Sequence, residues 1–276
     1  MSALDPRIHP YRADLAALSL RDVVDAPRYA EPDRLIVTAP VSDMLVQPDG
    51  TGGIGSQLRA GEAFDVYDTA DGLAWGQSVA DGYMGYVAEA ALSPGTEGGQ
   101  RIAALMTTAY DGPSIKARPL STLPQGARIV VLRQDGAFVE TAHGFIPSAH
   151  LEPQDGDPVS VAEMYLDMPY LWGGRSSFGL DCSALVQMLA ESARVPCPRD
   201  SDMQQALGRE TEDLERGDLV FWKGHVGIMQ DAETMLHATE YRMRVLSEPL
   251  ATATARIAEN GGGPVVARRR FMAEPA

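Results

Sequence analysis

An internal repeat is the feature that most constrains the fold of this chain. The segment from Leu58 to Leu92 aligns with the segment from Leu123 to Leu151. Both copies are short runs of alternating apolar and polar residues, broken by Gly, Asp and Pro, a pattern typical of small antiparallel barrels. Two copies predict two β-barrel domains, at residues 35–93 and 100–152. The matched residues are Gly61 and Gly126, Asp71-Gly72 and Asp135-Gly136, Trp75 and Phe138, and Gly85-Tyr86 and Gly144-Phe145.

The segments on either side of the repeat have different patterns. Residues 1–34 carry leucines at helical spacing and are expected to form a helical arm that ends at Pro27. Residues 158–276 mix helical and strand patterns, which predicts an α+β domain. The expected helices begin at Ser160 and run from Ser183 to Val195, and the expected strands are Leu219 to Trp222, His225 to Met229 and Met235 to Ala238.

Charge and hydropathy exclude several classes of partner. The 38 acidic residues outnumber the 23 basic ones, and a net charge of -15 would repel nucleic acids and anionic membranes. No apolar run reaches the length of about 18 residues that a membrane-spanning helix needs. The first residues lack the apolar core of a secretory signal, so we expect a cytoplasmic protein. In that compartment a disulfide between Cys182 and Cys197 is not expected.

Cys182 follows Asp181 where a glycine-rich loop gives way to a helical pattern. A helix N-terminus exposes unpaired N–H groups and a partial positive charge, so we expect a lowered thiol pKa and a nucleophile. Attack on an amide also needs a proton donor for the leaving amine, and histidine titrates in a suitable range. His225 and His237 lie on successive predicted strands. If the turn centres near residues 231 and 232, His225 falls opposite a position about one residue from His237.

The stretches "YLWGG", "DCSALVQ", "RGDLVFWKGHVGIM" and "MLHAT" together resemble the NlpC-type cell-wall peptidases, which are papain-like cysteine peptidases. The resemblance covers about residues 159–250, and the two barrels in front resemble bacterial SH3-like domains. It implies that Cys182 is the nucleophile, His225 the general base and His237 the orienting third member. It also implies that Tyr170 and the Cys182 backbone N–H support the substrate carbonyl, and that no cofactor is needed.

The order of domains is similar to one subgroup of these peptidases, which hydrolyses the bond between γ-D-glutamate and a diamino acid. The implied partners are small murein peptides with a free N-terminal L-alanine. In this subgroup Asp181 would pair with the substrate ammonium, Ser183 and Ser201 would contact the peptide, and Tyr83 of the first barrel would close the pocket. An acidic residue of the first barrel should also bind the amine, and Asp43 and Asp49 are the candidates.

Other interpretations remain open at this stage. Asp181 could be an ordinary helix N-cap, worth about 1 kcal/mol, although a carboxylate beside a nucleophilic thiol is unexpected without a cation to neutralise it. A zinc site built from Cys182, His225 and His237 is disfavoured by the ligand spacing. The chain could be a non-catalytic binding protein for wall fragments. It could also be a thiol amidase or acyltransferase that acts on other γ-glutamyl compounds.

Overall fold

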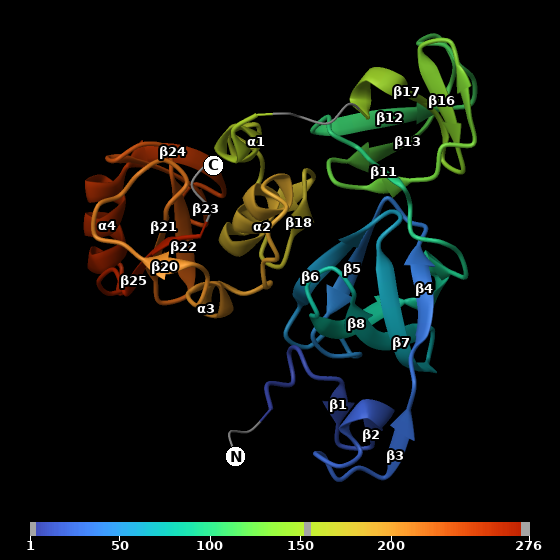
Figure 1. Ribbon diagram of the computed structural model, residues 1–276, viewed down its shortest axis with the longest axis horizontal. Helices are drawn as coiled ribbons and strands as arrows, with labels where there is room; N and C mark the ends of the chain where they lie inside the picture. The colour runs from blue at the N-terminus through green and yellow to red at the C-terminus, as the bar shows by residue number, and fades with distance from the viewer. Residues whose placement is uncertain (1–3, 152–155, 272–276) are drawn as a thin grey trace. The chain divides into compact units, whose positions relative to one another are not determined.

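The computed structural model describes residues 4–151 and 156–271. The chain divides into two compact units, residues 1–153 and 154–276 (Figure 1). The expected boundary near residue 152 stays a prediction, and residues 152–155 lie outside the described residues. The finer domain boundaries remain predictions.

The expected N-terminal helical arm is wrong. This segment forms a three-stranded sheet of β1 (Tyr11–Arg12), β2 (Leu15–Ala17) and β3 (Arg28–Ala30), with a single 3₁₀ turn at Leu18–Leu20. Leu15 is buried against Trp75 and Met84. A helix this short is marginal by itself, whereas pairing β2 with β3 satisfies the backbone and buries Leu15.

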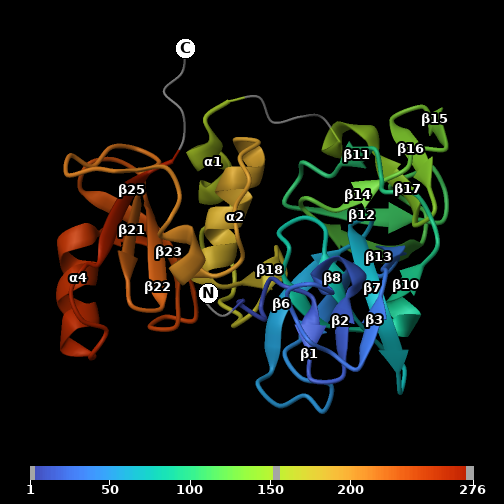
Figure 2. The ribbon, with the colours of Figure 1, turned by 60° about the horizontal axis from the view of Figure 1, so that its bottom comes forward.

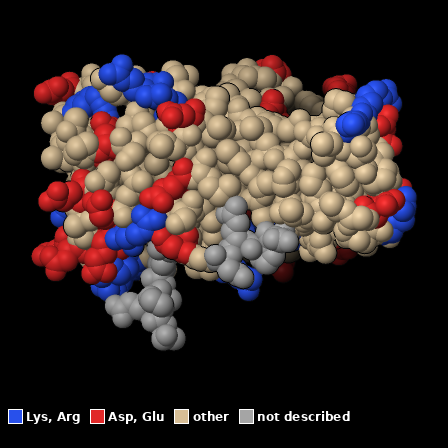
Figure 3. All heavy atoms as spheres, turned by 90° about the horizontal axis from the view of Figure 1, so that it is seen from above, with Lys and Arg blue, Asp and Glu red and all other residues tan. Residues whose placement is uncertain are grey.

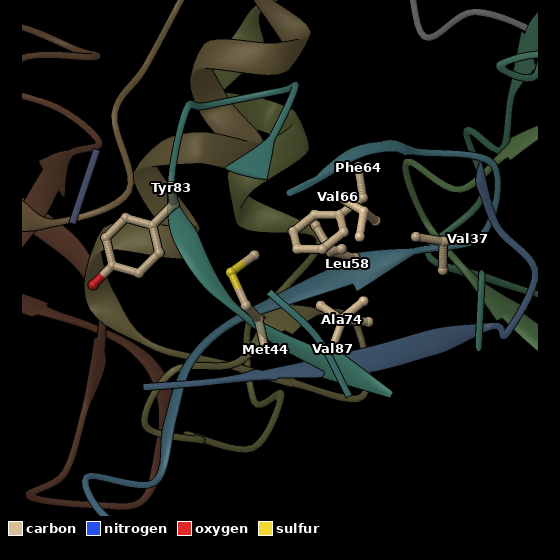
Figure 4. Packing of buried hydrophobic residues seen from close by; sticks show 8 residues of the cluster. All are labelled: Val37, Met44, Leu58, Phe64, Val66, Ala74, Tyr83 and Val87. Atoms are coloured by element: carbon tan, nitrogen blue, oxygen red, sulfur yellow. The ribbon is translucent and has the colours of Figure 1, made fainter. Parts of the chain in front are cut away.

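The first copy of the repeat lies in a seven-stranded sheet with the order β10-β4-β7-β8-β9-β5-β6. Its apolar core gathers side chains from nearly every strand (Figure 4). The strands are β4 (Asp33–Val37), β5 (Val41–Leu45), β6 (Ile54–Arg59), β7 (Ala63–Ala70), β8 (Leu73–Ser78), β9 (Met84–Ala88) and β10 (Leu92–Ser93), with a 3₁₀ turn at Glu89–Ala91.

The second copy has a core of its own and follows the same strand order in its central part. The β12-β13 hairpin packs beside β17, and β17 beside β16, as the β5-β6 hairpin packs beside β9, and β9 beside β8. Its identity as a second SH3-like barrel stays a prediction. The strands are β11 (Gln100–Arg101), β12 (Met106–Tyr110), β13 (Pro119–Pro124), β14 (Arg128–Ile129), β15 (Arg133–Asp135), β16 (Phe138–Thr141) and β17 (Gly144–Pro147), followed by a 3₁₀ turn at Ser148–His150.

The matched glycines of the repeat lie where the two copies meet. Gly61 has φ +77°, and a Cβ there would lie 2.0 Å from the carbonyl oxygen of Arg128 in the second copy. Gly126 has φ +80°, and its Cβ would lie 2.2 Å from the guanidinium of Arg59 in the first copy. Only glycine tolerates both the backbone conformation and the close approach. Both matched glycines therefore lie at contacts between the two copies.

The C-terminal unit is a six-stranded antiparallel sheet, in the order β20-β25-β21-β22-β23-β24, covered by helices. Helices α2 and α4 lie on opposite sides of it (Figures 1 and 2), and α4 packs on Trp222 and Met235. The expected helices and strands of this unit are confirmed to within a few residues. They are α1 (Pro158–Glu163), β18 (Arg175–Ser176), β19 (Gly179–Leu180), α2 (Cys182–Ser192), α3 (Ser201–Gln204), β20 (Arg209–Glu210), β21 (Leu219–Trp222), β22 (His225–Met229), β23 (Thr234–Thr239), β24 (Arg244–Pro249), α4 (Leu250–Glu259) and β25 (Ala267–Arg270).

Acidic and basic side chains are intermixed on the face shown in Figure 3. Many acidic and basic side chains of the described residues form ion pairs, such as Arg216 with Glu163 at 2.9 Å and Arg270 with Asp218 at 2.8 Å. Across the described ranges, no helix combines the length and apolar character needed to cross a bilayer.

Candidate active site

Cys182 is the first residue of α2, and Asp181 is the N-cap of that helix. The Asp181 Oδ1 atom accepts a hydrogen bond of 2.9 Å from the backbone N–H of Ala184. The preceding β18-β19 hairpin delivers the chain to this point, and it needs Gly174, because a Cβ there would lie 2.5 Å from the carbonyl oxygen of Gly179. The glycine-rich stretch before Cys182 in the sequence is therefore a tight hairpin that ends at the start of α2.

Cys182 is buried, with 8% of its surface exposed. Burial is the main cause that raises the pKa of the thiol to about 12, and the negative charge of Asp181 is the second. Backbone hydrogen bonds from Val226 and Ser183 and the charge of Arg199 act in the opposite direction, but they are weaker. The expected lowering of this pKa by the helix N-terminus is therefore wrong, because desolvation of a buried thiolate outweighs the helix dipole.

His225 and His237 contact each other directly. The Nε2 atom of His225 lies 2.8 Å from Nδ1 of His237, and the two rings meet edge to face. Strands β22 and β23 pair with Ile228 opposite Leu236; continued for three residues along each strand, this register places His225 opposite Thr239. The sequence expectation was thus wrong by one residue. The difference matters because residues two apart share a face of a sheet, whereas residues one apart do not.

Burial also controls the ionisation of His225. It lowers the pKa of the imidazole to about 3, assisted by the nearby charges of His237 and Arg256 and opposed by Glu248. Neither a lone Cys182 thiolate nor a lone His225 imidazolium is favourable near neutral pH. Both side chains are therefore neutral near neutral pH.

Arg199 is the cation that neutralises the Asp181 carboxylate beside the thiol, and the sequence analysis did not identify it. Its Nη1 and Nη2 atoms donate to the two carboxylate oxygens of Asp181 at 2.9 and 2.6 Å, and Arg199 is 1% exposed. Asp181 also accepts hydrogen bonds from Gly173, Ser183 and Ala184. Arg199 lies within the segment "PRDSDMQ", but a single arginine there carries no spacing signal that would pair it with Asp181.

The other expected substrate residues of this unit lie near the start of α2. Ser183 is the second residue of that helix and is buried. Ser201 opens α3, which packs on α2 through a 3.0 Å hydrogen bond from Gln204 to the Ser183 carbonyl. Tyr170 forms an isolated bridge with Leu180. Burial is the main cause that raises the pKa of the Tyr170 phenol above its ordinary value, and the charge of Cys182 is the second.

Tyr83 belongs to the N-terminal unit, just before β9. Its side chain stands at the edge of the first core, with the hydroxyl group pointing away from the other seven residues (Figure 4). Asp43 of the same unit lies on β5 and accepts a hydrogen bond of 2.9 Å from Gln57. The suggested roles of Tyr83 and Asp43 at the active site stay predictions.

Two residues beside the histidines were missed by the sequence analysis. Glu248 on β24 accepts a hydrogen bond of 2.8 Å from His237 Nε2, and Arg256 on α4 forms an ion pair with Glu248. Neither residue lies in a sequence stretch that indicated a catalytic or binding role. Within residues 4–151 and 156–271, no group of three or more His, Cys, Asp or Glu side chains is arranged to hold a metal ion.

Comparison with known proteins assigns these features to a family. Residues 167–256, which include Cys182 and both histidines, match the NlpC/P60 family. The C-terminal unit is an NlpC/P60 domain. Residues 44–92 match the bacterial dipeptidyl-peptidase SH3 domain, so the expected combination of an N-terminal SH3 domain with an NlpC-type domain is confirmed.

Curated relatives of this chain include two proteins named γ-D-glutamyl-L-lysine dipeptidyl-peptidase. The *Bacillus cereus* protein is 32% identical over 47% of this chain and 40% of its own length, and the *Bacillus subtilis* protein is 32% identical over 40% and 43%. The matches thus span less than half of either relative. A crystal structure of an NlpC/P60 family protein from *Bacillus cereus* superposes with a TM-score of 0.72 at 18% identity, over 87% of this chain and all of the other, and shares the fold.

Proposed function

We propose that this protein is a cysteine peptidase that hydrolyses the amide between γ-D-glutamate and a diamino acid in small murein peptides. The observation that carries the proposal is the arrangement at the start of α2. There the buried Cys182 thiol accepts a hydrogen bond from the backbone N–H of Val226, the residue after His225. The Nε2 atom of His225 is hydrogen-bonded to His237 Nδ1. The names of the two *Bacillus* relatives support this substrate class.

The chemistry follows from the ionisation of Cys182 and His225. As the sulfur attacks the carbonyl carbon, the thiol proton passes to Nδ1 of His225, so no isolated charge forms in the buried site. The Cys182 backbone N–H and the Tyr170 hydroxyl are the proposed donors to the developing oxyanion. His225 then returns the proton to the leaving amine. Water attacks the thioester with His225 as base, which releases the glutamyl product and restores the thiol.

Recognition of a free N-terminal amine is a second part of the proposal. The resemblance to the γ-D-glutamyl subgroup implies that Asp181 binds the amine, but this carboxylate already accepts five hydrogen bonds, two of them from Arg199. A carboxylate offers about four lone-pair sites, so an incoming ammonium has to share or displace one of these donors. Ser183, Ser201 and Tyr83 are the proposed further contacts of the peptide.

The test is cleavage of L-Ala-γ-D-Glu-diaminopimelate and its L-lysine counterpart, each with a free and an N-acetylated amine, followed by mass spectrometry. Cys182→Ala is the inactive variant. Cys197→Ala is the matched control, because Cys197 is the other of the two cysteines in the chain. We expect cleavage of the free peptides by the wild type and by Cys197→Ala, and none by Cys182→Ala.

N-acetylation tests the amine recognition without disturbing the fold, which an Asp181 substitution would do. Loss of a charge-assisted interaction should reduce kcat/KM by about a hundredfold. Equal cleavage of blocked and free peptides would refute the proposed recognition of the free amine.

Binding without cleavage would favour the non-catalytic alternative, and cleavage of other γ-glutamyl amides alone would favour the amidase. Action on recycled wall peptides in the cytoplasm stays a sequence prediction, to be tested by cell fractionation.

A further inference from the structure

The hydrogen bonds at the active site continue past His237. His225 Nε2 contacts His237 Nδ1 at 2.8 Å, His237 Nε2 contacts Glu248 Oε1 at 2.8 Å, and the same Glu248 oxygen receives Nη2 of Arg256. We propose that Glu248, held by Arg256, is a positioning residue that sets the proton arrangement of both histidines so that His225 can act as a base. This proposal rests on the proposed peptidase function.

The argument starts from the carboxylate. An ionised carboxylate only accepts hydrogen bonds, so the proton at the contact with Glu248 lies on His237 Nε2. In a neutral His237 the Nδ1 atom is then an acceptor, and the proton of the next contact must lie on His225 Nε2. This leaves a lone pair on His225 Nδ1, the nitrogen that has to accept the Cys182 proton. Without Glu248 the opposite arrangement becomes accessible, and in it His225 Nδ1 carries a proton and cannot act as a base.

The surroundings of Glu248 keep it ionised and in place. Burial acts to raise the pKa of its carboxyl group, but the hydrogen bonds from His237 and Arg256 outweigh burial and lower it. The Glu248 and Arg256 side chains are 14% and 13% exposed. Arg256 is itself held 4.1 Å above the ring of Tyr241. Glu248 lies opposite Met235 on β23 and thus shares a face of the sheet with His237.

Glu248 also acts during the reaction. When Cys182 transfers its proton, His225 becomes an imidazolium whose Nε2 proton remains bonded to His237. The negative charge of Glu248, which His237 Nε2 contacts, stabilises this cation across the His237 ring. Glu248 itself neither gains nor loses a proton in this step.

Two substitutions separate the contributions of Glu248. Glu248→Gln removes the charge but keeps an acceptor oxygen, and Glu248→Leu removes both. The matched control is Glu259→Gln, at an exposed position on the same helix as Arg256. Thermal unfolding of the purified full chain first establishes that each variant is folded. The measurements are kcat and KM on the free tripeptide, ¹⁵N NMR of the labelled histidine rings, and the alkylation rate of Cys182 by iodoacetamide, with Cys182→Ala as background.

We expect Glu248→Leu to lower kcat by about tenfold or more with KM nearly unchanged. Glu248→Gln should lie between this variant and the wild type. In wild-type spectra the Nε2 atom of both histidines should be protonated, and Glu248→Leu should shift protons toward Nδ1 and slow alkylation. A folded Glu248→Leu variant with wild-type kcat, alkylation rate and ring protonation would overturn the proposal. The NMR and alkylation measurements need no peptide, so they stand even if the protein cleaves no γ-D-glutamyl bond.

Discussion

Replacing Arg199 with methionine would leave the Asp181 carboxylate buried without its cation. The Arg199 and Asp181 side chains are only 1% and 11% exposed, and two hydrogen bonds of 2.9 and 2.6 Å join them. Removing one partner from such a pair typically costs about 3–5 kcal/mol. We therefore expect Arg199→Met to lower the free energy of unfolding of the C-terminal unit by about this amount. Alkylation of Cys182 should also slow, because the charge of Arg199 acts to lower the pKa of that thiol.

The same substitution at Arg244 is the matched control. Arg244 pairs with Asp167 at 2.9 Å, but the two side chains are 52% and 65% exposed, so Arg244→Met should cost less than about 1 kcal/mol. Hydrogen exchange of amides in β21 and β22 at increasing urea concentration measures unfolding of this unit separately from the N-terminal unit. The reasoning is refuted if Arg199→Met destabilises the unit no more than Arg244→Met does.

Three further predictions concern the same unit. Because burial raises the Cys182 pKa to about 12, the alkylation rate of the substrate-free protein should rise about tenfold per pH unit between pH 7 and 10; a plateau across this range would indicate a preformed thiolate. Because burial lowers the His225 pKa to about 3, only the unfolded chain takes up a proton at this residue as the pH falls below about 6.5. The free energy of unfolding should therefore fall by up to about 1.4 kcal/mol per pH unit from there towards pH 3. That of the His225→Gln variant should fall less steeply, as measured by urea titrations at each pH. Gly174→Ala should destabilise the hairpin before Cys182 by about 1–3 kcal/mol and reduce peptide cleavage, since the new methyl group meets the Gly179 carbonyl; an unchanged melting temperature and kcat would contradict this.

Local patterns in the sequence were sufficient for the elements of the C-terminal unit. Alternating and helical periodicities located β21, β22 and α2, and the stretch around Cys182 indicated a nucleophile at a helix start. The same method failed for residues 15–20, where helical spacing of leucines belongs to a strand and a single 3₁₀ turn. Pairing with β3 decided that case, and pairing partners distant in sequence leave no local periodicity.

The sequence alone determined the types of residue available for catalysis, a thiol and two imidazoles, and the two-copy repeat in front of them. Only the tertiary structure decided how these groups ionise and what holds them. The register of β22 and β23 brings His225 to His237, β24 and α4 add Glu248 and Arg256, and the segment before α3 brings Arg199 to Asp181. These contacts join residues up to 18 positions apart, and burial shifts the pKa values of Cys182 and His225 in opposite directions. Desolvation and charge pairing depend on the surroundings of a side chain in three dimensions, so no motif in the chain could have specified them.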